Sequence, residues 1–322
     1  MSFSNPWEQE LSKSGLISLH PHHDLYTTVS GPVRQPNQPL VIIIPGLGAS
    51  ATEWAAVQRL ATPFARVLLY ERSGYGLSSD ATSPVTAVSI AMELDSLIRA
   101  ADISGPFVLV CHSYGGIIGR EFLHLRGSGA DGICGMVFVD ANQELNTIEG
   151  PGPAPYIDTV LQGLDIIDVV GLTKTHKLLP DEWQTYLIEE KSERHSRIAA
   201  MESEEYLGSG PVLASKKQLH ATPPLLGESP VSVLKGQTYK DFEKLFVAGS
   251  EAGNGTEEER KMFREFLKTY DTLDEKWQKG MLSLSSRSRW ITTYKSGHNI
   301  QLTEPDVIVD EIKWVLDNLD TV

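Results

Sequence analysis

The sequence predicts an α/β protein in which a mostly parallel, twisted sheet has helices on both faces and a helical cap interrupts the chain. Over the first 140 residues, short β-forming runs alternate with stretches of helical periodicity, the order that a parallel sheet with crossover helices requires. The run Leu40–Ile44 is apolar throughout, as a central strand buried on both faces must be. Between residues 141 and 228, by contrast, no convincing strand occurs.

The predicted strands are short apolar runs, and the first two are candidates for the edge of the sheet. In chain order they are Leu16–Leu19, Leu25–Val29, Leu40–Ile44, Val67–Tyr70, Phe107–Val110, Met136–Val139, Val231–Leu234 and Trp290–Tyr294. In the first half of the chain, the helical stretches between the strands are Glu53–Leu60, Val88–Ala101 and Tyr114–Leu125.

A helical cap is predicted after Asp140. Within it, apolar residues at 157, 160, 161 and 164 have the spacing of an amphipathic helix. Pro180, followed by two acidic residues, favours the start of another helix. We therefore predict three segments: the first part of the core at 1–140, the cap at 141–228 and the second part of the core at 229–322.

Two further helices are expected in the second part of the core. Thr256 and Glu259 form a capping box at the start of the first of them. The buried stripe of this helix is predicted to comprise Phe263, Phe266, Leu267 and Tyr270. The second helix is expected from about Pro305 to Leu319.

The composition describes a globular chain with an acidic surface. Of the 322 residues, 41% are hydrophobic, which is enough for a large packed core and excludes a mainly disordered chain. Lys and Arg number 28 and Asp and Glu number 42, so the formal net charge is −14. Such a surface repels phosphate backbones and anionic lipids, so we expect no nucleic-acid or membrane partner. The sequence leaves the oligomeric state open.

The cysteines and the N-terminal histidines do not indicate a metal site. Cys111 and Cys134 alone form neither a disulfide framework nor a four-cysteine zinc site. His20, His22 and His23 have no acidic or cysteine partners at ligand spacing. No apolar run has the length of a signal-peptide core or a membrane span. We therefore expect a cytoplasmic protein that uses neither a metal nor a cofactor.

Ser113 is the predicted nucleophile. It lies between an apolar run and a helical stretch, with the small residues Cys111 and Gly115 two positions before and after it. A serine at the apex of such a strand–turn–helix is exposed at the carboxyl end of the sheet. The segment resembles the nucleophile elbow of the α/β-hydrolase family, G-x-S-x-G, with Cys111 in place of the first glycine. The resemblance extends from about residue 16 to the C-terminus and implies a cap-bearing serine hydrolase.

The resemblance also implies an oxyanion hole made of two backbone amides. The N–H of Tyr114, which follows the nucleophile, is one expected donor. By position, Leu47 in the loop Pro45–Ser50 supplies the second. A further segment, Tyr70–Ser78, is similar to the family, and Arg72 within it is expected to tie loops together.

His298 is the predicted general base. It follows the last predicted strand and precedes the C-terminal helix, a context that closely resembles the corresponding family segment. An imidazole makes a serine hydroxyl nucleophilic by taking its proton. His112 adjoins the nucleophile, but its side chain should point away from it.

The acid that orients the imidazole has three candidates. The family places this acid after one of two strands. Asp140, at the end of the strand Met136–Val139, resembles members that use the earlier position, and we favour it. Asp241, several residues beyond the strand Val231–Leu234, is the second candidate, and Glu144 is the third. Each choice keeps the chain order serine, acid, histidine.

The cap of such a hydrolase covers the active site. Tyr156, Trp183 and Tyr186 are candidates to bind the substrate, although they would equally well hold the cap together. We expect hydrolysis of a carboxylic ester or lactone of a small, largely apolar molecule through an acyl-enzyme; the serine argues against dehalogenation and epoxide opening. Two alternatives are a non-hydrolytic lyase or cyclase of a specialised metabolite and a ligand-binding protein that retains the pocket without turnover.

Overall fold

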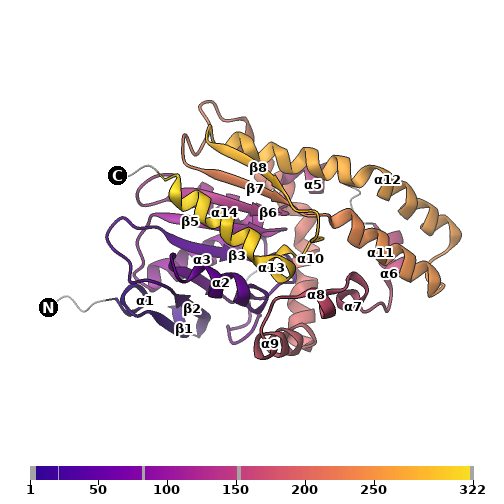
Figure 1. Ribbon diagram of the computed structural model, residues 1–322, viewed down its shortest axis with the longest axis horizontal. Coiled ribbons are helices and arrows are strands. Elements are labelled where there is room, and N and C mark those ends of the chain that lie inside the picture. Colours follow the sequence, from indigo (N-terminus) through magenta and orange to yellow (C-terminus); the bar gives the residue numbers. More distant parts are fainter. Residues whose placement is uncertain (1–4, 21, 82–83, 151–153, 320–322) are drawn as a thin grey trace.

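The computed structural model describes residues 5–20, 22–81, 84–150 and 154–319, and these form one eight-stranded sheet with helices around it (Figure 1). The strand order is β1-β2-β4-β3-β5-β6-β7-β8. The strands are β1 (Ser12–His20), β2 (His23–Ser30), β3 (Leu40–Ile44), β4 (Val67–Tyr70), β5 (Phe107–His112), β6 (Ile133–Val139), β7 (Val231–Lys235) and β8 (Ser288–Thr292). The pairs β1–β2 and β2–β4 are antiparallel and the others are parallel, which confirms the predicted fold class.

Helices connect the strands and form two larger excursions. The α-helices are α1 (Pro6–Gln9), α2 (Ala55–Ala61), α3 (Ala87–Ala100), α4 (Gly115–Arg126), α5 (Glu144–Ile148), α6 (Pro155–Leu161), α7 (Ile166–Val170), α8 (Leu172–Thr175), α9 (Pro180–Glu190), α10 (Glu193–Ala214), α11 (Thr238–Glu251), α12 (Glu257–Gly280), α13 (Ile300–Thr303) and α14 (Pro305–Asp317). Short 3-10 helices are η1 (Ala51–Trp54), η2 (Gln218–His220) and η3 (Met281–Leu284).

The sheet is buried on both faces because its central strands alternate their side chains between two apolar clusters. Ile42 of β3 points into the cluster that includes α3 and α4, whereas its neighbours Val41 and Ile43 point into the cluster that includes α2 and α14. Every residue of β3, β4, β5 and β7 is buried. These continuous apolar strands therefore need helices on both sides, as parallel sheets generally do.

The helical excursions lie at the same side of the molecule. The first, α5 to α10, leaves the sheet after β6, and its described residues contain no strand, as predicted. The second, α11 and α12, leaves after β7 and packs against α6 and α7 (Figure 1). The second excursion falls within the segment that we assigned to the core, so both segments contribute helices beyond the sheet.

One predicted helix is shorter than expected, and another begins where its capping box predicts. The helix that contains residues 157–161 ends at Leu161, because the chain turns at Gly163 with a φ of 73°. The capping box at Thr256 and Glu259 is present, and it starts the long helix α12. Of the predicted stripe, Phe263 is fully buried and the other members are half-buried.

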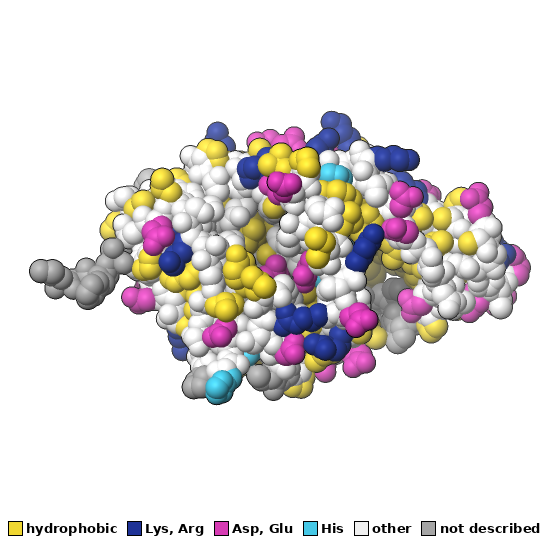
Figure 2. Space-filling model, turned by 90° about the horizontal axis from the view of Figure 1, so that it is seen from below, with side chains coloured by type: hydrophobic (Ala, Val, Ile, Leu, Met, Phe, Trp, Pro, Cys, Tyr) yellow, Lys and Arg dark blue, Asp and Glu magenta, His cyan; other side chains and the backbone are white. Residues whose placement is uncertain are grey.

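Acidic and basic side chains are interspersed over the face seen in Figure 2, with apolar patches between them. The narrower end of the molecule in that view is the end formed by α6, α11 and α12 in Figure 1. Among the described residues, none of the helices has the length and apolar character needed to cross a membrane.

Candidate active site

Ser113 lies at the apex of a tight turn between β5 and α4, with a φ of 51°. Its carbonyl oxygen accepts the amide N–H groups of Gly116 (2.9 Å) and Asn142 (2.8 Å), which fixes the turn. A Cβ on Gly115 would collide with the carbonyl oxygen of Ile44 at the end of β3. Only glycine therefore allows this close approach, and the serine is held at the carboxyl end of the sheet.

Asp140 and His298 form a hydrogen-bonded pair beside this turn. The imidazole Nδ1 lies 2.7 Å from Asp140 Oδ2. The other carboxylate oxygen accepts the backbone N–H of Gly236 and the side-chain amide of Gln278, both at 2.9 Å. The hydroxyl of Thr238 donates to Oδ2 as well. Because Asp140 is buried and has these donors, its carboxylate has a fixed orientation towards the ring.

The structure distinguishes the three candidate acids by their contacts. Asp241 accepts the backbone N–H of His298 at 2.9 Å and so holds the loop rather than the ring. Glu144 forms a buried ion pair with Arg120. In the described part of the chain, Asp140 is the one of the three whose carboxylate is hydrogen-bonded to the imidazole.

The pKa of Asp140 is held well below its ordinary value. Burial alone would raise it, but the hydrogen bond and charge of His298 and the hydrogen bonds from Thr238 and Gln278 stabilise the carboxylate. Burial also opposes the charged form of His298, but Asp140 outweighs it and raises the pKa of the ring. Burial, and then the charge on His298, lowers the pKa of His112 to about 3. Asp140 is therefore ionised and faces the imidazole of His298, whose pKa is raised. The neighbouring ring of His112 is neutral.

His112 contacts the loop that carries His298. Its Nε2 lies 3.1 Å from the carbonyl oxygen of His298, and the two ring centroids are 4.6 Å apart. Since the side chain of His112 is buried in this contact, it points away from the cavity at Ser113, as expected.

Ser113 and His298 line the same cavity, which has a volume of about 630 Å³. The cavity lies between the carboxyl end of the sheet and the helices of both excursions. Among its other lining residues are Asn142, Asn146, Ile166, Val170, Tyr206, Thr238, Asp241, Phe242, Leu245, Phe266, Tyr270 and Trp277. Most of these side chains are apolar or aromatic, and a few polar groups lie near the serine, a composition typical of small-molecule sites.

A family model described as the alpha/beta hydrolase family matches residues 41–311. The chain belongs to this family. This α/β hydrolase is 33% identical over 97% of its length to an AB hydrolase superfamily protein of Gibberella zeae, 98% of which is covered. It is 30% identical over 99% of its length to the probable transporter efuK of Hormonema carpetanum, but it covers 45% of that protein.

Solved structures share the fold. An esterase from Exiguobacterium antarcticum has a TM-score of 0.59 and 14% identity, with 95% of this chain and 100% of that chain covered. The epoxide hydrolase CorEH has a TM-score of 0.61 and 12% identity, with 96% and 99% covered. The serine hydrolase CarC, involved in carbazole degradation, has a TM-score of 0.61 and 15% identity, with 95% and 99% covered.

The two amides expected to form the oxyanion hole of this α/β hydrolase lie beside Ser113. Tyr114 directly follows Ser113, and the loop of Leu47 approaches from β3, where a Cβ on Gly46 would lie 3.0 Å from Ser113 Cβ. Among the described residues, the N–H groups of Leu47 and Tyr114 donate no hydrogen bond. Both donors are therefore available to an anionic oxygen, which is what an oxyanion hole requires.

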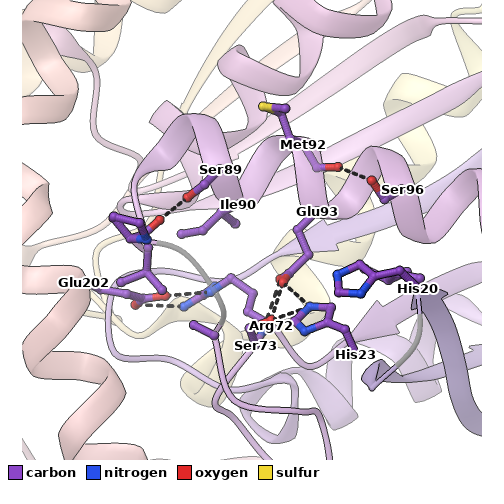
Figure 3. A pocket seen from close by; sticks show the side chains of 14 residues that line it. His20, His23, Arg72, Ser73, Ser89, Ile90, Met92, Glu93, Ser96 and Glu202 are labelled. Atoms are coloured by element: carbon purple, nitrogen blue, oxygen red, sulfur yellow. Dashed lines mark hydrogen bonds and ion pairs between the residues drawn. The ribbon is translucent and has the colours of Figure 1, made fainter.

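A buried ion pair fixes the loop of Leu47 to α10. Arg72 donates to the carbonyl oxygens of Pro45 (3.1 Å), Gly46 (2.8 Å) and Ala49 (3.2 Å), which confirms that it ties loops together. Its guanidinium also donates to Glu202 of α10 at 2.8 and 3.1 Å (Figure 3). Glu202 in turn accepts the N–H of Gly48 and the hydroxyl of Tyr75, both at 2.9 Å.

Replacing Glu202 with alanine is expected to lower the free energy of unfolding by about 3–5 kcal/mol, because it leaves Arg72 buried without its anion. Glu204, exposed on the same helix, is the matched control, and Glu204→Ala should change stability by less than about 0.5 kcal/mol. Urea unfolding of both variants measures the difference. A loss below about 1 kcal/mol for Glu202→Ala would show that the pair does not hold the loop.

The three aromatic residues expected to bind the substrate lie outside the cavity wall. Trp183 stacks on His176 with ring centroids 3.8 Å apart. Tyr186 of α9 is buried in the cluster that includes Leu172 of α8 and Leu302 of α13. Tyr156 lines a neighbouring groove along α12 rather than the cavity itself. The structure thus does not bring these side chains to Ser113 and His298.

Sequence reasoning missed several aromatic side chains that line the same cavity as Ser113. Phe242, Phe266, Tyr270 and Trp277 come from α11 and α12, and Tyr206 comes from α10. The periodicity of α12 predicts an apolar stripe, but a helix that only packs against a core has the same stripe. The sequence therefore does not show that this stripe lines a cavity.

A second cluster of serine, histidine and glutamate lies in a smaller pocket of about 320 Å³ (Figure 3). His23 Nε2 lies 3.1 Å from both the Ser73 hydroxyl and the Glu93 carboxylate. Because both partners meet the same ring nitrogen, the carboxylate does not orient the ring through one nitrogen while the other takes the serine proton, which is what a catalytic triad requires. The described residues contain no group of three or more His, Cys, Asp or Glu side chains placed to hold a metal.

Proposed function

We propose that this α/β hydrolase is a serine hydrolase that cleaves a carboxylic ester or lactone of a small, largely apolar molecule. One observation carries the proposal: the imidazole of His298, which lines the cavity of Ser113, has its Nδ1 only 2.7 Å from a buried carboxylate of Asp140. Because Nδ1 is bonded to Asp140, Nε2 is the nitrogen left to take the proton of Ser113.

The reaction follows from these groups. Ser113 Oγ attacks the carbonyl carbon as its proton passes to His298 Nε2, and the N–H groups of Leu47 and Tyr114 stabilise the anionic oxygen. The carbon–oxygen bond to the alcohol then breaks, and the imidazolium returns the proton to the leaving alkoxide. Water, deprotonated by the same ring, attacks the acyl-serine, and the carboxylic acid leaves as Ser113 regains its proton.

The test combines a covalent probe with labelled water. A fluorophosphonate is expected to modify Ser113, and hydrolysis of p-nitrophenyl butyrate in H₂¹⁸O should place one labelled oxygen in the released acid. An enzyme that never forms an acyl-serine would give no adduct. An adduct without ester cleavage in labelled water would instead favour lyase or cyclase chemistry, and neither an adduct nor turnover would favour a binding protein.

A further inference from the structure

Resting on the proposed serine hydrolase function, we propose that the substrate is elongated and that its apolar chain continues from the cavity at Ser113 into a groove along α12. The groove has a volume of about 510 Å³. Phe266, Tyr270 and Trp277 line both the groove and the cavity. The two hollows are therefore adjacent, with the side chains of one helix as a shared wall.

The shared wall follows the geometry of the helix. Met262, Phe266, Tyr270, Leu273 and Trp277 are separated by steps of three or four residues, and all five line the groove. Such spacing places them in one stripe. The fifteen residue steps from Met262 to Trp277 extend about 22 Å at roughly 1.5 Å per step. The apolar surface along α12 is thus long and narrow, which suits a chain rather than a compact ring system.

The shared side chains are anchored differently. Trp277 is buried, and its indole N–H donates to Glu149 at 3.2 Å. Phe266 and Tyr270 are half-buried and meet Phe242, which lines the cavity, with ring centroids 5.4 and 5.1 Å apart. Rotations of two half-buried rings are sterically easier than displacement of a buried, hydrogen-bonded indole. A chain that extends from the cavity into the groove would therefore pass Phe266 and Tyr270.

The wall of the groove restricts the chemistry of the chain. Met262 is 46% exposed there, a large apolar side chain that a substrate would cover. Of the carboxylates that line the groove, Glu149 lies 3.6 Å from Lys276 and Glu265 lies 2.6 Å from Lys268, so their charges are paired. The apolar stripe is therefore the part of the wall that selects the chain. The expected substrate class is an ester with an uncharged aliphatic chain, on either its acyl or its alcohol half.

Chain-length series test the groove. We would measure kcat/KM for p-nitrophenyl esters of straight-chain acids from two to twelve carbons and for acetates of straight-chain alcohols of the same lengths. In one of the two series, kcat/KM should rise once the chain is long enough to reach the groove. Each methylene buried there should raise kcat/KM by up to about a factor of four. Met262→Trp fills the groove and should lower the ratio of ten-carbon to four-carbon kcat/KM about tenfold.

Two further variants keep the test decisive. Leu273→Glu places a charge in the groove and should lower the same ratio, so a folding defect in Met262→Trp would not hide the effect. Val247, 51% exposed on α11 and outside both hollows, is the control, and Val247→Trp should keep the ratio unchanged.

The outcomes separate this inference from the function on which it rests. If the unmodified enzyme hydrolyses neither series, the proposed function fails. If the enzyme hydrolyses short esters but folded Met262→Trp and Leu273→Glu have the same ratio of ten-carbon to four-carbon kcat/KM as the unmodified enzyme, the groove does not bind the substrate chain. A ratio lowered by both variants and unchanged in Val247→Trp supports the proposal.

Discussion

Replacing Ser113 with alanine is expected to lower kcat for ester hydrolysis by roughly 10⁵–10⁶-fold, because loss of the nucleophile removes the acyl-enzyme route entirely. The melting temperature should stay nearly unchanged. In the described structure the Ser113 hydroxyl makes no hydrogen bond within the protein, so its removal leaves no buried partner unsatisfied. The turn is held by backbone groups, which alanine retains: the carbonyl oxygen of residue 113 still accepts the N–H groups of Gly116 and Asn142.

Ser73→Ala is the matched control, because Ser73 is also a serine in contact with a histidine. Its hydroxyl bonds to Glu93 and lies 3.1 Å from His23 Nε2, in a pocket that does not contain Ser113. Loss of that hydroxyl should lower the melting temperature by a few degrees and change turnover little. Assays of p-nitrophenyl butyrate hydrolysis measure turnover, and thermal unfolding measures the melting temperature. Full activity in Ser113→Ala, or loss of activity in Ser73→Ala alone, would show that Ser113 is not the nucleophile.

The elements of the sheet and the turn at Ser113 were predictable because their signals are local. A run such as Leu40–Ile44 must be buried on both faces whatever surrounds it, and the turn at Ser113 needs small neighbours within two residues. The position of Asp140 was predictable for a related reason. Parallel strands end at one edge of the sheet, so a residue directly after β6 lies near the end of β5 whatever form the helices take.

The walls of the cavity were not predictable in this way. Trp183 and Phe266 both lie on amphipathic helices, and periodicity says which face is buried but not against what. Trp183 stacks on a histidine of its own excursion, whereas Phe266 reaches the cavity because α11 and α12 pack against each other and against α6. Likewise, Gln278 is 138 residues from its partner Asp140, and no local pattern records that contact. Such placements depend on tertiary packing between segments that are far apart in the chain.

Replacing Asp140 with asparagine is expected to lower kcat about 10⁴-fold while the protein stays folded. The reason lies in the donors around this side chain. Gly236 and Gln278 both donate to Oδ1, so the amide oxygen of asparagine should occupy that position and its NH₂ group should face His298. The ring nitrogen Nδ1 must then accept a hydrogen bond, which leaves the proton on Nε2. A ring with that tautomer cannot take the proton of Ser113.

The pH profile separates this effect from a general distortion of the site. His298 must be neutral to act as a base, and Asp140 raises its pKa, so activity should be lost as the pH falls through that raised value. Without the anion the pKa of the ring falls, and the acid limb of the remaining activity should move to lower pH. Profiles of kcat/KM for both proteins between pH 4 and 9 measure the shift.

Asp241→Asn is the control for the alternative acid. Asp241 accepts the backbone N–H of His298, and an amide oxygen accepts the same bond, so this variant should lose only a few-fold in kcat. The prediction fails if Asp140→Asn keeps most of its activity and an unshifted acid limb while Asp241→Asn loses both. Since Asp241 lies on the first turn of α11 and Asp140 at the end of β6, that result would also require the His298 loop to adopt a different position during turnover. The two carboxylates therefore test whether the 2.7 Å contact between Asp140 and His298 is the one used in the reaction.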